Sequence, residues 1–315
     1  MNVSVVIPTR DRRDELLCTL AALRDQRDPG GGFEVIVADN GSSDGSLEAV
    51  QGLTGGDRDG AAMRLRAISE PRGGPAAARN AGVAAAAGEV ILFLGDDTEP
   101  ADPGLVAAHG RLHREAGDAR YGVLGHVAWS GRQEVTPLMD WLGRTFQFGY
   151  DALEPGPGRV PPRRAFWTAH VSVRRELFEC AGGFDTRFPW AAVEDVELGL
   201  RLERLGGWLE YHPELLVLHT HPTELGPSLE RSRRVGRSAA LLHELHPDWS
   251  DRELAAARGP AWLGLRLSAP LWRALAAVAP RGRIREHAWR RMHQVAYARG
   301  FAEGPPPPAG DRTQT

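Results

Sequence analysis

Three groups of acidic residues lie where the sequence pattern places the end of a strand or the start of a helix. Asp39 follows a short β-rich run, and Asp96 and Asp97 follow the most apolar run in the chain. Glu194 and Asp195 open a segment whose apolar residues have helical spacing. Because open α/β sheets bind their ligands at such termini, these carboxylates are the first candidates for a functional site.

The adjacent carboxylates of Asp96 and Asp97 predict a site for a divalent metal ion. Two neighbouring negative charges at the end of an apolar strand are costly to bring together unless a cation neutralises them. Mg²⁺ or Mn²⁺ suits such a site, because these ions bind one or two protein carboxylates and take water and phosphate oxygens at their other positions. An ordinary acidic turn is the alternative, but the apolar strand before the pair favours a metal site.

The other two acidic groups each allow a structural and a functional interpretation. Asp39 lies in the sequence Val-Ala-Asp-Asn-Gly-Ser-Ser-Asp-Gly-Ser at residues 37–46. Its carboxylate could accept hydrogen bonds from a base or a ribose, or it could form an Asx turn that caps the next helix. Glu194 and Asp195 could belong to the site, or they could simply suit the dipole at the start of their helix.

The elements that would position these residues alternate between strands and helices over the first hundred residues. This alternation is typical of a parallel sheet that is covered by helices. The fold class is therefore α/β, with a parallel central sheet flanked by helices. We expect the following elements: strands over residues 3–7, 33–38, 65–69, 89–94, 121–129 and 215–218, a loop over residues 153–164 and a helix over residues 193–205.

After residue 222 the sequence becomes helical and basic. Residues 225–303 contain 14 Arg against 7 Asp and Glu, whereas the whole chain has a formal net charge of −3. That negative balance argues against a general nucleic-acid-binding protein. We expect an α/β domain over residues 1–222, a basic helical appendage over residues 223–303 and a disordered, proline-rich tail over residues 304–315.

The basic appendage itself has two interpretations. It could be an Arg-rich helical subdomain that packs on the sheet domain, and this is the interpretation that we favour. It could instead lie against anionic lipid through its arginines and through Trp262, Trp272 and Trp289. No stretch of the sequence is long and apolar enough to span a bilayer, so any membrane contact would be peripheral.

The start of the chain and its cysteines point to a cytoplasmic protein. The strand-like run at residues 3–7 leaves no room for a signal peptide. Cys18 and Cys180 lie in apolar stretches without the spacing of metal ligands. We expect them to be buried free thiols, which fit a reducing compartment.

Six short motifs connect the acidic groups into one series along the first 222 residues. The motifs are Ile-Pro-Thr-Arg at 7–10, Asp-Asn-Gly-Ser-Ser-Asp-Gly at 39–45, Ala-Arg-Asn-Ala-Gly at 78–82, Phe-Leu-Gly-Asp-Asp at 93–97, Gly-Gly-Phe-Asp at 182–185 and Glu-Asp-Val-Glu-Leu at 194–198. Each motif is weak by itself, but the series resembles glycosyltransferase family 2, whose fold is called GT-A. The resemblance implies a Rossmann-like central sheet that is mixed but mostly parallel and is flanked by helices. The resemblance implies transfer of a sugar, with inversion, from a nucleoside diphosphate sugar to a hydroxyl group of a glycan, a lipid-linked or a secondary-metabolite acceptor.

The resemblance also implies which residues bind the nucleotide sugar. Asp39 would contact the base or the ribose, and Asp96 the ribose or the sugar. Arg79 would lie near the base or the diphosphate, where a guanidinium can make bidentate contacts. The nucleotide pocket would be lined by the residues that follow the first strand: Pro8, Thr9 and Arg10.

Metal binding and proton transfer are assigned in the same way. Asp97 would hold Mg²⁺ or Mn²⁺ on the diphosphate, and His219 would complete the metal site, with an ordinary hydrogen-bonded histidine as the alternative. Asp195 would be the general base for the attacking hydroxyl group, and Glu194 would support the acceptor site. The chain departs from the family at Gly95, where a further acidic residue is common.

Three other functions fit the sequence less well. A nucleotidyltransferase or a dinucleotide dehydrogenase would carry a glycine-rich phosphate loop after the first strand, where this chain has Pro-Thr-Arg at residues 8–10. A non-catalytic nucleotide-sugar-binding protein of the same fold would be expected to lose Asp97 or Asp195. Both residues are present, so we favour the enzyme.

Overall fold

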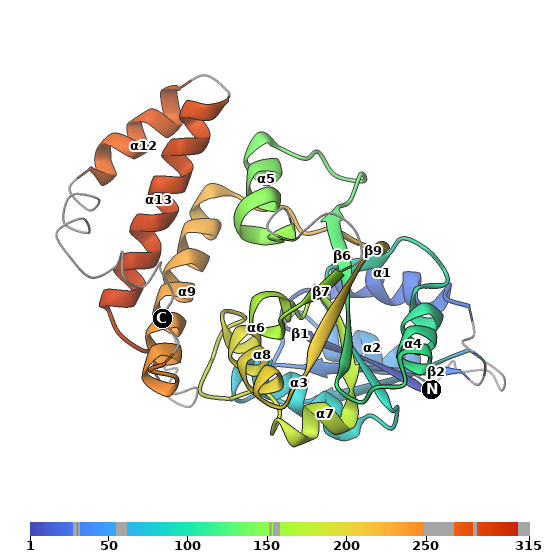
Figure 1. Cartoon of the computed structure of the whole chain (residues 1–315). Helices are drawn as coiled ribbons and strands as arrows, with labels where there is room; N and C mark the ends of the chain where they lie inside the picture. The colour runs from blue at the N-terminus through green and yellow to red at the C-terminus, as the bar shows by residue number, and fades with distance from the viewer. Residues whose placement is uncertain are drawn as a thin grey trace.

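A nine-stranded mixed sheet flanked by helices forms the centre of the molecule in the computed structural model (Figure 1). The structure describes residues 1–27, 30, 32–54, 62–150, 153, 158–248, 268–279 and 282–307. The strands of the sheet are β1 Val3–Thr9, β2 Phe33–Asp39, β3 Met63–Ser69, β4 Val90–Leu94, β5 Thr98–Pro100, β6 Tyr121–Trp129, β7 Gly158–Val160, β8 His170–Arg174 and β9 Trp208–His219. Their spatial order is β3-β2-β1-β4-β8-β6-β9-β5, with β7 paired to β9.

Helices connect the strands and continue beyond the last one. The first group is α1 Arg13–Arg24, α2 Ser46–Thr54, α3 Gly74–Ala85, α4 Leu105–Ala116, α5 Pro137–Leu142, the π-helix η1 Gly143–Gln147, α6 Pro162–Ala165, α7 Arg175–Cys180 and α8 Glu194–Arg204. The group after the sheet is α9 Leu225–Leu245, α12 Ala269–Val278 and α13 Arg283–Ala302. This arrangement confirms the predicted α/β fold class with a helical appendage.

The first four strands are parallel and end at the same edge of the sheet. Strand β1 pairs in parallel with β2 and β4, and β2 pairs in parallel with β3. Thr9 lies opposite Asp39, and Asp39 lies opposite Ser69. Strands β2 and β4 are buried over their whole length, because both faces of the sheet are covered. The register therefore brings the residues that follow β1, β2 and β4 to one place.

Strand β9 is much longer than the sequence pattern predicted. The prediction covered residues 215–218, whereas the strand begins at Trp208 and ends at His219. It pairs in parallel with β6, which lies about ninety residues earlier in the chain, and the register shifts between Gly125 and His126. Pairing over this sequence distance extends a strand whose own residues carry only a weak β pattern.

The loop predicted over residues 153–164 contains two short elements. Strand β7 pairs antiparallel with β9, and α6 begins at Pro162, where proline suits the first turn of a helix. The prediction of buried cysteines was also wrong, because Cys18 and Cys180 are both exposed. Each lies on the solvent side of an amphipathic helix, where an apolar neighbourhood in the sequence does not mean burial.

The end of the chain lies against α9. Arg237 donates hydrogen bonds to the carbonyl oxygens of Gly304 and Pro305 at 3.2 and 2.7 Å, and Pro306 is buried. These contacts involve the first residues of the proline-rich tail, and residues 308–315 lie outside the described residues, so the disordered tail stays a prediction. Among the residues that the structure describes, no helix combines the length and the apolar character needed to cross a membrane.

Helices α9 and α13 cross at two glycines. A Cβ atom added at Gly236 would overlap the carbonyl oxygen of Tyr297, and one added at Gly300 would overlap that of Arg233. Alanines 239, 240 and 298 and Phe301 pack beside the crossing. Small residues thus allow the two backbones to touch, and this contact fixes α13 on α9.

We expect Gly236→Ala to destabilise the protein, because its methyl group meets backbone rather than a movable side chain. The free energy of unfolding should fall by about 1–3 kcal/mol, as for overpacked cores. Gly226 in the same helix has open space around it, so Gly226→Ala is a matched control that should leave stability unchanged or raise it by less than about 1 kcal/mol. Thermal unfolding of both variants measures this, and equal midpoints would contradict the close crossing.

Candidate active site

The two adjacent carboxylates lie directly beyond the buried strand β4, as predicted. Thr9, the last residue of β1, donates a hydrogen bond from Oγ1 to Asp96 Oδ2 at 2.9 Å. Thr19 of α1 donates to the Asp96 carbonyl oxygen at 3.0 Å. A Cβ atom at Gly95 would lie 2.8 Å from Asp97 Oδ1. Glycine at this position, where the family often has an acidic residue, therefore gives the Asp97 carboxylate room.

Two basic groups converge on Asp97. Arg12, just before α1, places Nη1 against Asp97 Oδ2 and 3.4 Å from Asp96 Oδ1. His219 at the end of β9 places Nε2 3.3 Å from the same Asp97 Oδ2. The antiparallel pairing of β5 with β9, which sets Thr98 opposite His219, brings this histidine to the carboxyl edge.

The electrostatics of the carboxylate pair reflect its burial. Burial raises the pKa of Asp96, the neighbouring Asp97 raises it further, and Arg12 lowers it. Burial also acts to raise the pKa of Asp97, but His219 and Arg12 outweigh it, and the net pKa is lowered. Burial lowers the pKa of His219. Asp97 is thus the more acidic group and the better ligand for a cation.

The geometry of Asp97 and His219 fits a divalent metal ion. Ligands in neighbouring positions of an octahedral ion lie roughly 3 Å apart when each bond is about 2.1 Å long, and the observed separation is 3.3 Å. Arg12 now contacts the carboxylate oxygen that such an ion would share. No group of three His, Cys, Asp or Glu side chains that could hold a metal occurs in the described part of the chain. Phosphate oxygens and water would therefore have to supply the other ligands.

Asp39 performs the structural role that the sequence left open. Its carboxylate accepts hydrogen bonds from the backbone N–H groups of Gly41 at 3.1 Å and Ser42 at 3.2 Å. Pro8 and Thr9 lie beside it, opposite Ala38 and Asp39 in the register of β1 and β2. The side chain of Arg10 is exposed and pairs with Asp11 at 3.6 Å.

Glu194 and Asp195 form the first turn of α8. The residue before them, Val193, has a φ of 74°, a left-handed conformation that a β-branched residue rarely adopts. Glu194 Oε1 accepts a bond from Arg79 Nη1 at 2.8 Å, and the two side chains are only 1% and 8% exposed. The guanidinium of Arg79 also lies 5.4 Å from the centre of the Phe184 ring. A buried ion pair thus joins α3 to the start of α8.

Asp195 has an environment that suits proton transfer near neutral pH. Burial and the neighbouring Glu194 raise its pKa to about 7, although Arg79 and Arg231 act in the opposite direction. Its Oδ1 accepts a bond from the backbone N–H of Val196 at 2.8 Å. A carboxylate with this pKa can accept a proton and release it again under physiological conditions.

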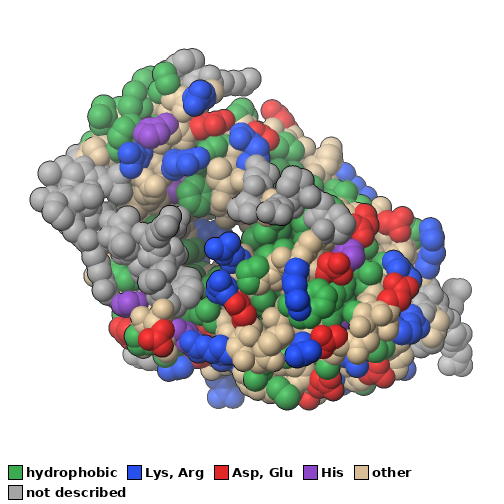
Figure 2. Space-filling model, viewed as in Figure 1, with side chains coloured by type: hydrophobic (Ala, Val, Ile, Leu, Met, Phe, Trp, Pro, Cys, Tyr) green, Lys and Arg blue, Asp and Glu red, His purple; other side chains and the backbone are tan. Residues whose placement is uncertain are grey.

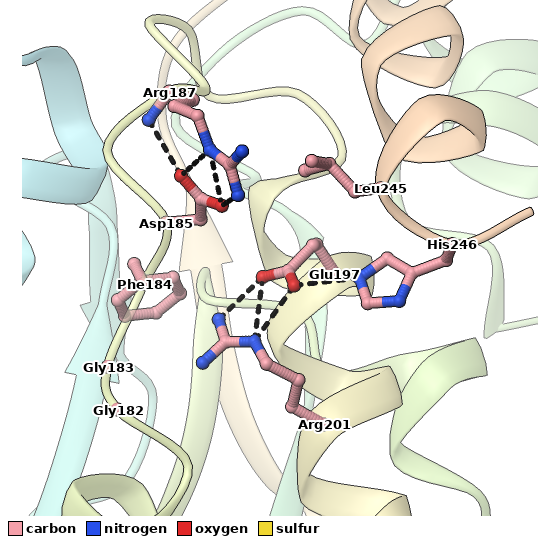
Figure 3. Close-up of a pocket in the computed structure, with 9 residues that line it drawn as sticks. All are labelled: Gly182, Gly183, Phe184, Asp185, Arg187, Glu197, Arg201, Leu245 and His246. Carbon is pink, nitrogen blue, oxygen red and sulfur yellow. Dashed lines mark hydrogen bonds and ion pairs between the residues drawn. The ribbon is translucent and has the colours of Figure 1, made fainter.

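A pocket of about 350 Å³ lies beside α8, where Glu197 of the first turn and Arg201 line it (Figure 3). Glu197 accepts bonds from Arg201 at 2.8 Å and lies 2.9 Å from His246 Nε2, just past the end of α9. Asp185 pairs with Arg187 at 2.6 Å on the facing loop. These charged groups thus pair with one another in the wall of the pocket, and the contact of Glu197 with His246 links α8 to the end of α9 there.

Sequence reasoning missed the basic residues Arg12 and Arg231. Arg12 stands three residues after Thr9, in the short connection between the first strand and the first helix. Its place beside the carboxylates could have been inferred from the parallel strand pattern, because that connection runs along the carboxyl edge. No local signal points to Arg231, which bonds to the carbonyl oxygen of Ala191, before α8, because α9 packs on α8.

Comparison with known proteins identifies the family. Residues 4–157 match the family model of glycosyl transferase family 2. Pre-mycofactocin glycosyltransferase of Mycobacterium tuberculosis is 30% identical over 264 residues, which cover 78% of this chain and 48% of that protein. Glycosyltransferase AglE of Haloferax volcanii is 32% identical over 239 residues, which cover 75% of this chain and 72% of that protein. The chain thus spans about half the length of the mycobacterial relative.

Among solved structures, the mannosyltransferase PcManGT from Pyrobaculum calidifontis, in complex with GDP-Man and Mn²⁺, has a similar fold. The TM-score is 0.62 at 20% identity, with 95% of this chain and 86% of that chain covered. The match in sequence includes β1, β2 and β4 with the carboxylates that follow them, and the match in fold extends over the sheet and the later helices. The chain belongs to glycosyltransferase family 2 and has the GT-A fold.

Proposed function

We propose that this protein is a glycosyltransferase that moves a sugar from a nucleoside diphosphate sugar to a hydroxyl acceptor. The observation that carries the proposal is the Asp97–His219 pair, 3.3 Å apart at the carboxyl edge of the sheet in a chain of this family. The relatives whose names state an activity are glycosyltransferases, and the PcManGT complex contains a nucleotide sugar and Mn²⁺. The acceptor class, whether glycan, lipid-linked or secondary metabolite, is part of the proposal.

The nucleotide would bind along the ends of β1 and β2. Pro8, Thr9 and Arg10 would line its pocket, and Asp39 would face the base or the ribose while it caps the turn that follows. Asp96 would contact the ribose or the sugar. Arg79 is held by Glu194, so we propose that it acts on the diphosphate only from this fixed position.

Asp97 and His219 would hold Mg²⁺ or Mn²⁺ on the diphosphate. When bound, such an ion supplies Lewis-acid stabilisation of the charge on the leaving nucleoside diphosphate. For the ion to bind, Arg12 would have to move away from Asp97 or share Asp97 Oδ2 with the ion. The side chain of Arg12 is 33% exposed, so it has room to move. Before the ion binds, Arg12 would balance the negative charge of Asp96 and Asp97 and hold their side chains at the edge of the sheet.

The chemical step that we propose is a single displacement with inversion. The acceptor oxygen attacks the anomeric carbon, and the bond from that carbon to the diphosphate oxygen breaks. The leaving nucleoside diphosphate takes the electron pair, and the hydroxyl proton passes to the Asp195 carboxylate. Glu194, held by Arg79, fixes the first turn of α8 and keeps the pKa of Asp195 high enough for it to act as a base.

The first test is nucleotide binding in the presence of a metal ion. UDP, GDP and TDP are each added with and without Mn²⁺, and thermal unfolding is recorded. We expect one nucleotide to stabilise the protein, by about 2.7 kcal/mol at about 100 times its dissociation constant, and only with metal. Asp97→Asn should abolish the shift, whereas Asp140→Asn, at an exposed position in α5, should keep it. If no nucleotide shifts the wild-type protein under any metal condition, the proposed function fails.

The second test is the pH dependence of turnover. Asp195 must be deprotonated to accept a proton, so kcat/KM should rise with pH through about 7 and then level off. Glu194→Gln removes a neighbouring negative charge and should move this rise to lower pH. Asp195→Asn should lower kcat roughly a hundredfold or more while nucleotide binding persists. A wild-type protein that binds nucleotide but neither transfers nor hydrolyses the sugar would instead be the non-catalytic binding protein.

An exposed apolar stripe on the helical appendage favours a second proposal, peripheral contact with an anionic membrane. Leu271 and Val278 of α12 and Ile284 of α13 are 56%, 78% and 59% exposed. Figure 2 shows hydrophobic side chains gathered on this part of the surface with basic ones among them. Apolar residues flanked by arginines are typical of helices that lie in a lipid interface. The cytoplasmic location expected from the sequence stays a prediction.

The tryptophans contribute less to this surface than the sequence suggested. Trp289 is buried against Trp141, so it cannot reach lipid. Trp272 is half-buried and donates a hydrogen bond to Ser268 at 2.9 Å. Trp262 lies outside the described residues. The membrane proposal therefore rests on the apolar stripe and the arginines.

Co-sedimentation with lipid vesicles tests the membrane proposal. We expect binding to phosphatidylglycerol vesicles but not to phosphatidylcholine vesicles, with a decrease at high salt. Val278→Asp should reduce the bound fraction several-fold, because it places a negative charge in the stripe. Val135→Asp, at an exposed apolar residue before α5, is the matched control. If equal fractions of the protein sediment with the two kinds of vesicle, the proposal is contradicted. Dimer formation through the apolar stripe would contradict it as well.

A further inference from the structure

The ring of His219 has a carboxylate and two aromatic side chains as neighbours. Its Nε2 is 3.3 Å from Asp97 Oδ2. The ring of Trp129 meets the imidazole nearly at right angles, at 83°, with 5.1 Å between the ring centres, and the ring of Phe148 lies 5.6 Å away. The centres of the Trp129 and Phe148 rings are themselves 4.8 Å apart. These two side chains, the aromatic pair, thus pack together beside the histidine.

Hydrogen bonds fix the backbone of His219 but leave one side of its ring without a polar partner. The His219 carbonyl oxygen accepts bonds from the backbone N–H of Ser130 at 2.9 Å and from Gln133 Nε2 at 3.0 Å. In contrast, Nδ1 is buried and has no hydrogen-bond partner among the described residues. A metal-binding histidine is usually oriented by a hydrogen bond from its second ring nitrogen. Within the described part of the chain, packing against the aromatic pair takes the place of that bond.

The contact with Asp97 cannot orient the ring for a metal ion. It is made by Nε2, the nitrogen that the proposed metal site requires. A neutral histidine that donates a hydrogen bond from Nε2 carries its proton there, whereas a histidine that binds a metal through Nε2 carries its proton on Nδ1. Packing between rings does not depend on which nitrogen carries the proton. The aromatic pair can therefore hold one ring orientation in both forms.

Trp129 is itself held in place from two directions. In the register of β6 and β9 it lies directly opposite His219. Its Nε1 donates a hydrogen bond to the carbonyl oxygen of Met139 in α5 at 2.9 Å. A Cβ atom added at Gly143, the first residue of η1, would lie 2.8 Å from the same nitrogen. Glycine at this position therefore lets the indole lie against the backbone of the helix.

Helix α5 in turn packs on the helical appendage (Figure 1). The centre of the Trp141 ring is 5.6 Å from that of Trp289 in α13. Arg144 Nη2, in η1, lies 3.3 Å from Glu286 Oε1 of α13. A continuous series of contacts thus runs from α13 through α5 to Trp129 and ends at the imidazole ring.

We propose that Trp129 is a positioning residue that holds the His219 ring in the orientation for metal binding. The proposal rests on the proposed function, because it takes His219 as a ligand of Mg²⁺ or Mn²⁺. The indole of Trp129 is a hydrogen-bond donor only, so it is not a ligand itself. It acts by restricting rotation of the imidazole about the Cβ–Cγ bond. Removal of the indole should therefore weaken metal binding although every ligand stays in the chain.

Binding of Mn²⁺ in the presence of a nucleoside diphosphate tests this role. The nucleotide is whichever of UDP, GDP and TDP stabilises the wild-type protein, and free Mn²⁺ is measured by its electron paramagnetic resonance signal. Trp129→Leu should weaken Mn²⁺ binding roughly ten- to hundredfold, the range found for residues that orient metal ligands. Trp129→Phe, which keeps a flat ring but loses the N–H group, should bind Mn²⁺ with intermediate affinity.

Trp208→Leu is the matched control. Trp208 lies at the opposite end of the same two strands, where it pairs with Tyr121 in the register of β6 and β9 and packs against its ring at 4.9 Å. This substitution removes an indole from the same sheet far from His219. We expect it to lower the unfolding temperature and to leave the affinity for Mn²⁺ unchanged.

A double-mutant cycle separates positioning from a general loss of packing. Trp129→Leu is repeated in a His219→Ala background, where no imidazole is left to orient. If Trp129 acts through His219, the substitution no longer changes the Mn²⁺ affinity in that background. Weakening by the same factor in both backgrounds would overturn the proposal, and so would wild-type affinity of Trp129→Leu. Trp129→Phe goes through the same cycle and replaces the leucine variant if that variant does not fold.

The same measurements separate this inference from the proposed function. If the wild-type protein binds Mn²⁺ with nucleotide and His219→Ala binds it equally well, His219 is not a ligand. The positioning role of Trp129 is then overturned, while the proposed sugar transfer stands. If the wild-type protein binds no nucleotide under any metal condition, the proposed function fails and this inference fails with it.

Discussion

Negative charge buried at the carboxyl edge of the sheet is the constraint on which the rest of the site depends. Asp96 and Asp97 come from the end of β4, and Glu194 from the start of α8, far apart in the chain. Leaving such a carboxylate without its partner costs roughly 3–5 kcal/mol. Arg12 and Arg79 supply the partners, so the start of α1 and the position of α3 are set by charge as well as by apolar packing.

The backbone at the start of α8 adds strain to this charge balance. Val193 holds a left-handed conformation, which costs of the order of 1–3 kcal/mol for a non-glycine residue. Its side chain packs with Phe188, Leu241 and Leu242, and these contacts hold the strained turn. The turn places Asp195 beside Glu194 in a buried setting, and that setting raises the pKa of Asp195. The packing of α9 on Val193 thus helps to keep the pKa of Asp195 raised, although Asp195 belongs to α8.

Most of the sheet could be predicted because its signals are local. Strands such as β2 and β4 are continuous apolar runs, and their ends place Asp39, Asp96 and Asp97 without any knowledge of the fold. What could not be predicted depends on contacts between distant segments. The length of β9 is set by β6, and the contact of Glu197 with His246 by helix packing. Local sequence carries no information about such partners.

Contacts between distant segments also cross the predicted domain boundary at residue 222. Composition changes there, from alternating strands and helices to basic helices, and this change predicted a helical appendage that packs on the α/β domain. Side-chain contacts cross the boundary at several points, and three of them are the bond from Arg231 to Ala191, the contact of His246 with Glu197 and the packing of Leu242 on α8. All three lie on or next to the helix that begins with Glu194 and Asp195. A boundary in composition therefore runs between segments that pack on each other, and the start of α8 is held partly by residues of α9.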